Sequence, residues 1–285
     1  MAITELGGRV AVVTGAASGL GLALAERFAA EGMRLVLADV ETTALESAVN
    51  RLVEAGATAI GVPTDVTDAE AVDDLARAAV DAFGTAHVVC NNAGVGGHHY
   101  PTWEAPLPYW DWVLSVSLGG VVHGVRSFLP MLLAQGEGHV VNTASVGGLV
   151  PVPYSAPYAA AKHAVVGLSG SLYGELAAMD SPVRVSVLCP GAMATGFTAS
   201  DRNWPVSLGA PPPEATDPVA RAAHEFIVQN VNAGGAASAV ADSVVDAIHT
   251  DRFMIVTETD GGTARAAFES ATMGGAPTSG TRGPT

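Results

Sequence analysis

Short β-branched apolar runs alternate with helix-like stretches along most of the chain, and this alternation is the strongest constraint on its fold. The apolar runs lie at residues 9–15, 34–39, 58–65, 86–91, 138–145, 183–191 and 252–257. The stretches with helical periodicity lie at 19–32, 41–55, 68–83, 108–135, 155–179 and 238–250. Strands that are apolar on both faces and separated by helices are typical of βαβ units. We therefore expect an α/β, doubly wound fold, in which helices cover both faces of a seven-stranded parallel sheet.

No internal repeat or shift in composition marks a second domain, so we expect a single domain over residues 1–272. Residues 192–235 interrupt the alternation with a long segment that contains several prolines. A connection of this length in a compact domain is usually a lid or a binding loop, and we expect a substrate lid here. Residues 273–285 are rich in Gly, Pro, Ser and Thr, and we expect a tail that is flexible or that a partner orders.

The composition indicates a globular protein, because 49% of the residues are hydrophobic and only 14% are charged. The net charge of −15 disfavours binding to nucleic acid through a basic face. The N-terminus lacks the pattern of a signal peptide, and no uninterrupted apolar run is long enough for a membrane span. We therefore expect a cytoplasmic protein with no membrane span. Cys90 and Cys189 lie in apolar runs and are expected to be buried thiols.

The segment TGAASGLG (14–21) directly follows the first apolar run and opens the first helical stretch. Glycines let the backbone turn sharply and approach a ligand closely, and the N–H groups at the helix start attract an anion. A glycine triplet alone is weak evidence, but its place between a strand and a helix predicts a nucleotide site. The expected binding residues in this loop are Gly15, Ser18, Gly19, Leu20 and Gly21.

Asp39 ends the second apolar run, where an acidic side chain can accept hydrogen bonds from the ribose hydroxyls of an adenosine. Its charge would repel a 2′-phosphate, and no arginine lies in the glycine loop or just after Asp39. The residue therefore favours NAD over NADP as the cofactor. The alternative is a strand-end aspartate that only faces solvent.

Tyr158 and Lys162 form the segment YAAAK within a helical stretch that is otherwise small and apolar. Residues four apart lie on one face of a helix, so the phenol and the ammonium group are neighbours. Taken alone, the pair favours a core tyrosine beside a lysine at the rim, because any long helix contains such pairs by chance. In a reactive pair, the cation would favour the phenolate and make the tyrosine a better base.

Five motifs occur in a characteristic order: TGAASGLG, NNAG (91–94), Ser145, YAAAK and PGAMAT (190–195). Together they resemble the short-chain dehydrogenase/reductases, in their shorter single-domain branch, over about residues 7–257. The resemblance implies a Rossmann fold, a nicotinamide cofactor, hydride exchange between an alcohol and a carbonyl, and a homodimer or homotetramer.

The resemblance also assigns roles to residues. Tyr158 would be the general acid/base, Lys162 its partner, and Ser145 would hold the substrate oxygen. A serine hydroxyl can indeed stabilise a developing oxyanion. The further cofactor-binding residues that the resemblance implies are Asp65, Val66, Asn92, Ala93, Gly94, Pro190, Gly191 and Thr195, besides Tyr158 and Lys162 themselves.

The chain departs from the family at Ser117, in the stretch SVSLGGV (115–121). Many members have an asparagine there, which is thought to kink the helix and to hold a water that relays protons to the lysine. A serine can bond a water or bond back to its own helix, but it lacks the reach of the amide. We include Ser117 among the candidate catalytic residues, and its part in a proton relay is in question.

Aromatic residues gather in YPTWEAPLPYWDW (100–112), and Trp204 lies in the insertion. These rings either wall a cleft for an apolar or aromatic substrate, or pack a loop or a subunit interface. His98 and His99 lack a carboxylate or cysteine at ligand spacing, so we expect an exposed loop pair and no metal site.

The function that these features favour is an NAD-dependent oxidoreductase acting on a hydrophobic or aromatic secondary alcohol or its ketone. An epimerase or dehydratase of the same fold would usually carry a longer substrate domain. A third hypothesis, suggested by Ser117, is a catalytically weakened NAD-binding sensor or scaffold.

Overall fold

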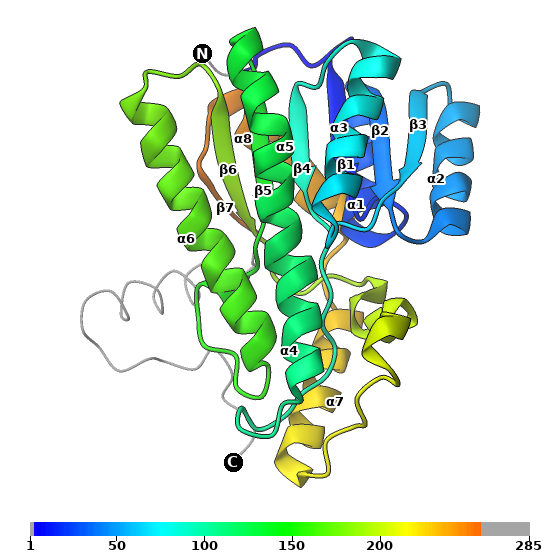
Figure 1. Cartoon of the computed structure of the whole chain (residues 1–285), viewed down its shortest axis with the longest axis vertical. Coiled ribbons are helices and arrows are strands. Elements are labelled where there is room, and N and C mark those ends of the chain that lie inside the picture. Colours follow the sequence, from blue (N-terminus) through cyan, green and yellow to red (C-terminus); the bar gives the residue numbers. More distant parts are fainter. Residues whose placement is uncertain (1–2, 258–285) are drawn as a thin grey trace.

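A seven-stranded parallel sheet forms the centre of the molecule in the computed structural model, which describes residues 3–257 (Figure 1). The strand order is β3-β2-β1-β4-β5-β6-β7, with every neighbouring pair parallel. The strands are β1 (Val10–Thr14), β2 (Arg34–Asp39), β3 (Thr58–Pro63), β4 (Val88–Asn91), β5 (His139–Thr143), β6 (Arg184–Cys189) and β7 (Met254–Val256). Each strand lies within an apolar run named above, and the predicted doubly wound Rossmann architecture is confirmed.

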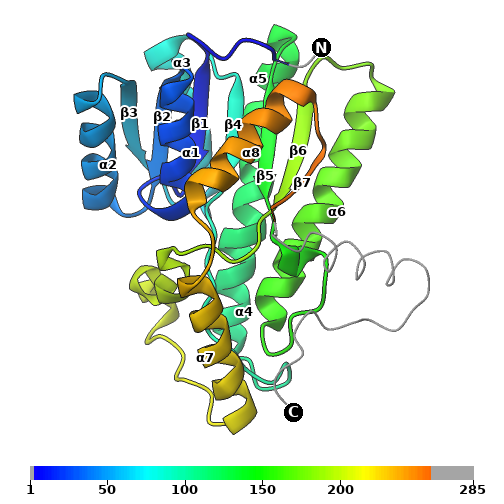
Figure 2. The ribbon, with the colours of Figure 1, turned by 180° about the vertical axis from the view of Figure 1, so that it is seen from behind.

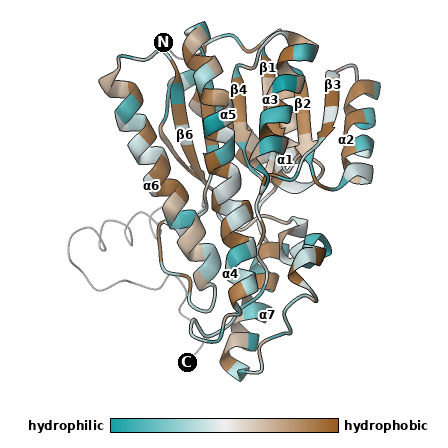
Figure 3. Cartoon of the chain, viewed as in Figure 1, coloured by the Kyte–Doolittle hydropathy of each residue, from teal (hydrophilic) through white to brown (hydrophobic). Residues whose placement is uncertain are grey.

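Helices cover both faces of the sheet (Figures 1 and 2). One face is covered by α1 (Gly19–Ala30), α2 (Thr42–Glu54) and α8 (Ala237–Thr250), and the other by α3 (Ala69–Phe83), α5 (Gly120–Gln135) and α6 (Ala156–Ala178). The strands are apolar and most helices are apolar along one side only (Figure 3). Burial of these surfaces on both faces of the sheet provides the main driving force for folding. Cys90 and Cys189 are both buried free thiols, as predicted.

The predicted helix at 108–135 is interrupted. It consists of α4 (Leu107–Leu114), a π-helical turn (Ser115–Gly119) and α5. By length and composition the whole stretch Leu107–Gln135 is apolar enough to cross a membrane. In this fold α5 packs against α3, β4 and β5. Part of the apolar surface of this stretch is therefore explained by the core of the domain.

The insertion at 192–235 contains a helix that the sequence analysis did not identify. It is α7 (Pro218–Asn232), preceded by 3-10 turns at Gly196–Asn203 and Val206–Leu208. Asp217 caps α7 by accepting a hydrogen bond from Ala220 N at 2.7 Å, and Pro218 opens the helix. This segment lies beyond the carboxyl edge of the sheet, next to α4 (Figures 1 and 2). The predicted tail at 273–285 lies outside the described residues.

The loop after β5 makes a very close contact with α6 at Gly148. A Cβ atom on Gly148 would lie 2.6 Å from the carbonyl oxygen of Lys162 and 2.8 Å from its carbonyl carbon. These are main-chain atoms in the middle of a helix, so they cannot move aside as a flexible side chain would. The absence of a side chain at Gly148 thus sets how closely the loop approaches the helix that carries Lys162.

We therefore predict that Gly148→Ala lowers the free energy of unfolding by about 1–3 kcal/mol, because an added methyl group must displace packed backbone. Gly174→Ala is the control, since nothing lies within 4 Å of a Cβ atom at Gly174 in the same helix. That variant should be neutral or slightly more stable. Urea unfolding of both variants tests this. Equal stabilities for the two variants would contradict the steric account.

Candidate active site

A cavity of about 390 Å³ lies at the carboxyl edge of the sheet. This is where ligands bind in open parallel sheets, at the point where the strand order reverses between β1 and β4. The cavity is lined by Gly15, Ser18, Gly19, Leu20, Gly21, Asp39, Asp65, Val66, Asn92, Ala93, Gly94, Ser145, Tyr158, Lys162, Pro190, Gly191 and Thr195. Sixteen of these are the predicted cofactor-binding residues and the other is Ser145, so the structure brings them to one site. Ser117 does not line the cavity.

The glycine loop runs from β1 into the first turn of α1. Gly15 and Gly19 adopt positive φ angles of 66° and 53°, which L side chains rarely adopt. A Cβ atom on Gly21 would lie only 2.0 Å from the carbonyl oxygen of Gly15. The side chain of Ser18, at the N-cap of α1, makes no capping hydrogen bond. The loop therefore leaves the first N–H groups of the helix available to an anionic ligand.

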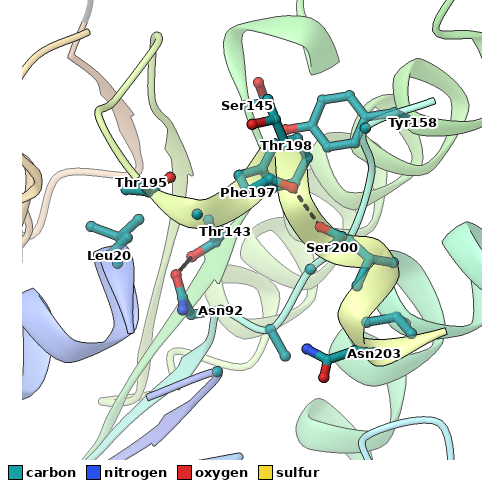
Figure 4. A pocket seen from close by; sticks show the side chains of 18 of the residues that line it. Leu20, Asn92, Thr143, Ser145, Tyr158, Thr195, Phe197, Thr198, Ser200 and Asn203 are labelled. Carbon is teal, nitrogen blue, oxygen red and sulfur yellow. Dashed lines mark hydrogen bonds between the residues drawn. The ribbon is translucent and has the colours of Figure 1, made fainter. Parts of the chain in front are cut away.

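Asn92 connects the glycine loop to the cavity wall formed by β5 and α6. Its Nδ2 donates to the Thr14 carbonyl at 3.0 Å, and its main-chain N donates to Thr14 Oγ1 at 2.9 Å. On its other side, Asn92 Oδ1 accepts a hydrogen bond from Thr143 Oγ1 at 3.3 Å (Figure 4). The Thr143 carbonyl in turn accepts from Lys162 Nζ at 2.8 Å. Residues from β1, β5 and α6 are thus joined through one amide side chain.

Ser145, Tyr158 and Lys162 lie together on the cavity wall. Ser145 follows β5, while the other two come from the first turns of α6, and Figure 4 shows the Ser145 and Tyr158 side chains close together. Ser145 Oγ accepts a hydrogen bond from Gly147 N at 3.0 Å. Lys162 Nζ lies 5.7 Å from the centre of the Tyr158 ring.

The pKa of Tyr158 differs from the expectation drawn from YAAAK. Burial raises the pKa of this phenol above its ordinary value, and a hydrogen bond with Ser145 opposes this only in part. Burial also lowers the pKa of the Lys162 ammonium to about 8. In the protein alone, the lysine therefore does not bring the pKa of the phenol below its ordinary value. The Lys162 ammonium is bonded to the Thr143 carbonyl, and desolvation of the phenol outweighs its attraction.

Ser117 is fully buried within the π-helical turn. Its Oγ donates to the Val95 carbonyl at 3.3 Å and accepts from Val95 N at 3.1 Å. The hydroxyl therefore bonds the loop after β4. It does not bond back to its own helix, which was one of the two possibilities for a serine at this position. A Cβ atom on Gly94 would lie 3.6 Å from Ser117 Oγ and 3.4 Å from Lys162 Nζ, so both groups flank the same glycine. The proton of the Ser117 hydroxyl is thus engaged by the Val95 carbonyl. The π-helical turn itself is of interest, because such turns often occur at functional sites.

The insertion contacts the loop after β2, beside Asp39. Arg202 Nε and Asn203 Nδ2 both donate to Glu41 Oε1 at 2.8 Å, and these bonds lower the pKa of Glu41. The Asp39 carboxylate accepts from Ala17 N at 2.9 Å and from Glu41 N at 3.0 Å. An arginine thus does reach this end of the cavity, although none lies in the glycine loop or just after Asp39. Nothing in the local sequence signals this, because Arg202 arrives from the distant insertion.

Only some of the clustered aromatic residues reach the cavity. Tyr109 and Trp112 line it, and Trp112 packs edge-on against the buried Trp204 of the insertion, with ring centres 5.0 Å apart. Phe197, also from the insertion, lies 5.3 Å from the Tyr158 ring (Figure 4). Trp103 is 85% exposed and takes no part. The aromatic segment therefore both walls the cavity and packs loop against insertion.

His98 and His99 are not an exposed loop pair, and that prediction is wrong. His99 is buried, and the side chain of His98 is only 12% exposed. The insertion covers both: His98 Nε2 lies 2.7 Å from Asp201 Oδ2, and His99 Nδ1 lies 3.0 Å from His224 Nδ1. Within residues 3–257, no group of three or more His, Cys, Asp or Glu side chains is arranged to hold a metal ion.

Residues 9–206 match the sequence model of the short chain dehydrogenase family. The chain belongs to this family. It is 46% identical over 197 residues to 1-deoxy-11-beta-hydroxypentalenate dehydrogenase of Streptomyces exfoliatus, covering 67% of this chain and 71% of that protein.

Solved structures of the family are also similar to this chain. The structure of a short chain dehydrogenase/reductase from Burkholderia phymatum in complex with NAD has a TM-score of 0.91 and 42% identity, covering 98% of this chain and 99% of that one. Actinorhodin polyketide ketoreductase with NADPH has a TM-score of 0.74 and 32% identity, covering 90% and 97%. This short-chain dehydrogenase is therefore an oxidoreductase of hydroxyl or ketone groups with a nicotinamide cofactor.

The residues present fit such a cofactor. The uncapped N-terminus of α1 and the glycine loop suit a pyrophosphate, and Asp39 lies where an adenosine ribose would be bound. A Cβ atom on Gly19 would lie 3.3 Å from the Thr195 side chain, so the loop and the strand-end segment after β6 approach closely.

The buried Lys162 of this short-chain dehydrogenase predicts a pH dependence of stability. Folding lowers its pKa from 10.5 to about 8, so the unfolded chain binds more protons between these values. Stability linked to this group therefore rises as the pH increases from about 8 to about 10. We expect the difference in unfolding free energy between the unaltered protein and Lys162→Met to move by about 2 kcal/mol in favour of the unaltered protein over this window. Urea unfolding at several pH values measures it, and a flat or falling difference would contradict the assignment.

Proposed function

We propose that the chain is an NAD-dependent dehydrogenase/reductase that exchanges hydride with a hydrophobic or aromatic secondary alcohol or its ketone. The observation that carries this proposal is the grouping of Ser145, Tyr158 and Lys162 on one wall of the cavity. The same cavity continues to the glycine loop on one side and to the aromatic side chains of Tyr109 and Trp112 on the other.

In the proposed mechanism, the bound cofactor would accept a hydride from an alcohol as NAD or supply a hydride to a ketone as NADH. The Ser145 hydroxyl donates a hydrogen bond to the substrate oxygen, because its own oxygen is held by Gly147 N. The Tyr158 hydroxyl lies beside it and exchanges a proton with the same oxygen. Since burial raises the pKa of Tyr158, the phenol is protonated at neutral pH and is ready to donate to a ketone. Lys162 remains largely charged at neutral pH and stabilises the phenolate when the proton leaves.

The substrate class follows from the walls of the cavity beyond Tyr158. Phe197, Trp112 and Tyr109 supply aromatic surface, and Ile227 and Val231 of α7 add aliphatic surface. Such walls favour an apolar alcohol over a polyol or a phosphorylated sugar. The name of the Streptomyces relative describes a dehydrogenase of a hydroxypentalenate, which agrees with this class. We propose that the insertion at 192–235 is the substrate lid.

We propose NAD as the cofactor on the basis of charge. Among the described residues that line the cavity, the cationic side chains of Lys and Arg are Lys162 and Arg202. Lys162 lies at the catalytic wall, and Arg202 is paired with Glu41. The carboxylate of Asp39 therefore faces a 2′-phosphate without a free cation to offset the repulsion.

The alternative is a catalytically weakened NAD-binding sensor or scaffold of the same fold. It is favoured by Ser117, whose hydroxyl is spent on Val95 and does not face the cavity. Against it stands the placement of Ser145, Tyr158 and Lys162, since a protein that only binds the nucleotide has no need of the three together.

We further propose a soluble, cytoplasmic homodimer or homotetramer. Within Leu107–Gln135, only 28% of an apolar 18-residue segment is buried in one copy of the chain. An exposed apolar surface of this kind suits a contact between subunits. The net charge of −15 argues against nucleic acid as a partner.

Tyr158→Phe tests the proposed chemistry. Removing the hydroxyl should lower turnover of an apolar secondary alcohol by at least about 100-fold, because no group remains to exchange the proton. NADH binding, measured by fluorescence titration, should change little. Turnover is followed by absorbance of the reduced nicotinamide, with a panel of apolar and aromatic secondary alcohols and their ketones. Turnover within a few-fold of the unaltered protein would remove the tyrosine from the mechanism.

Asp39→Asn tests the cofactor preference, because it keeps an oxygen for Ala17 N while removing the charge. We expect the unaltered protein to bind NADH more tightly than NADPH, and the ratio of the two Kd values to shift towards NADPH by about tenfold in the variant. Asp180→Asn, an exposed site outside the cavity, should leave the ratio unchanged. Tighter binding of NADPH by the unaltered protein would refute the proposal.

A further inference from the structure

Two histidines from the loop after β4 join the insertion at the substrate end of the cavity. His98 pairs with Asp201, and His99 packs against His224 of α7 with ring centres 5.1 Å apart. Both His98 and His99 line the cavity. Their nitrogens differ in what they can offer a ligand, and this difference follows from their hydrogen-bond partners.

The tautomer of His99 is fixed by a chain of hydrogen bonds. His224 Nδ1 lies 3.0 Å from the Gly97 carbonyl oxygen, which can only accept, so this nitrogen carries a proton. The same nitrogen lies 3.0 Å from His99 Nδ1, and protons on both nitrogens would set two N–H groups against each other, so the tautomer with His99 Nδ1 unprotonated is the one compatible with this contact. Burial lowers the pKa of His99 to about 4, and the neighbouring histidines act in the same direction. At neutral pH, His99 is thus uncharged and carries its proton on Nε2.

The Nε2–H group of His99 is free for a ligand. Nε2 has no hydrogen-bond partner among residues 3–257. It is also absent from the set of inaccessible side-chain atoms that lack a partner, so this nitrogen is accessible. By contrast, both nitrogens of His98 are engaged: Nε2 with Asp201 Oδ2 at 2.7 Å and Nδ1 with the Tyr100 hydroxyl at 3.4 Å. His99, Tyr109 and Trp112 line the same cavity, so a ligand there can reach both a ring N–H group and aromatic surface.

We propose that His99 is a specificity-determining residue that donates a hydrogen bond from Nε2 to a second, uncharged oxygen of the substrate, remote from the oxygen bound by Ser145 and Tyr158. A donor in an apolar pocket favours a ligand that carries an acceptor there and disfavours one that leaves the donor unpaired. A neutral acceptor such as a carbonyl is preferred to a carboxylate, because His99 is uncharged and the carboxylate of Asp201 contacts the adjacent His98. The inference rests on the proposed function.

Three aromatic methyl ketones of similar shape test this inference: para-isopropylacetophenone, para-diacetylbenzene and para-acetylbenzoate. The first has no second acceptor, the second has a neutral one, and the third has a charged one. Calorimetry on the NADH-bound protein gives the Kd of each ketone, and NADH oxidation gives KM and kcat. We expect para-diacetylbenzene to bind about five- to tenfold more tightly than para-isopropylacetophenone, with the difference in KM and not in kcat.

In His99→Leu this preference should disappear, while para-isopropylacetophenone binds as before. His99→Gln retains an N–H donor of similar reach and should recover part of the preference. His249→Leu, on α8 and outside the cavity, is the matched control and should keep the full preference. NADH titration of each variant verifies that the nucleotide site is intact, so a folding defect in one variant would be recognised.

The outcomes separate this inference from the proposed function. Reduction of the ketones without a preference that depends on His99 would overturn the inference alone. A His99-dependent preference in binding without any turnover would support the inference and count against the proposed reaction. A His99-dependent preference for para-acetylbenzoate over para-diacetylbenzene would overturn the assignment of a neutral acceptor.

Discussion

The geometry of the site depends on two hydrogen bonds made by the side-chain amide of Asn92. This amide lies where the strand order reverses, so the chain leaves β1 and β4 in opposite directions and opens a crevice between them. One end of the amide holds the Thr14 carbonyl and the other holds Thr143 Oγ1. Because the Thr143 carbonyl binds Lys162, hydrogen bonds link the glycine loop to the wall that carries Ser145, Tyr158 and Lys162. The glycine loop and the proposed catalytic residues are therefore joined in one hydrogen-bonded network.

The insertion is tied to this network at both ends of the cavity. Arg202 and Asn203 bind Glu41 next to the nucleotide end, and Asp201 and His224 bind the histidines at the substrate end. Three of these four residues belong to one 3-10 segment, Gly196–Asn203, so a single short turn spans both attachments. Opening of the insertion would break polar contacts at both ends together, in agreement with the substrate lid proposed above.

The strands and the glycine loop could be predicted from local sequence patterns. The strands are short apolar runs buried on both faces, and the glycine loop has to lie between a strand and a helix, so both were predictable from spacing. The buried state of His99 was not, because the side chains that cover it come from α7, more than one hundred positions along the chain. The pairing of Arg202 with Glu41 is equally remote in sequence. Ser117 was identified by position, but its partner Val95 and the π-helical turn depend on tertiary packing.

The energetics of Tyr158 show why proximity in sequence was a poor guide to its ionisation. The tyrosine and Lys162 are one helical turn apart, yet the ammonium points to the Thr143 carbonyl and lies 5.7 Å from the centre of the phenol ring. Desolvation acts on both groups and disfavours the charge of each, which raises the pKa of the phenol and lowers that of the ammonium. The protein alone therefore keeps the tyrosine protonated. A positive charge brought next to the phenol would reverse this balance, and the base required for alcohol oxidation would then form only in the loaded site.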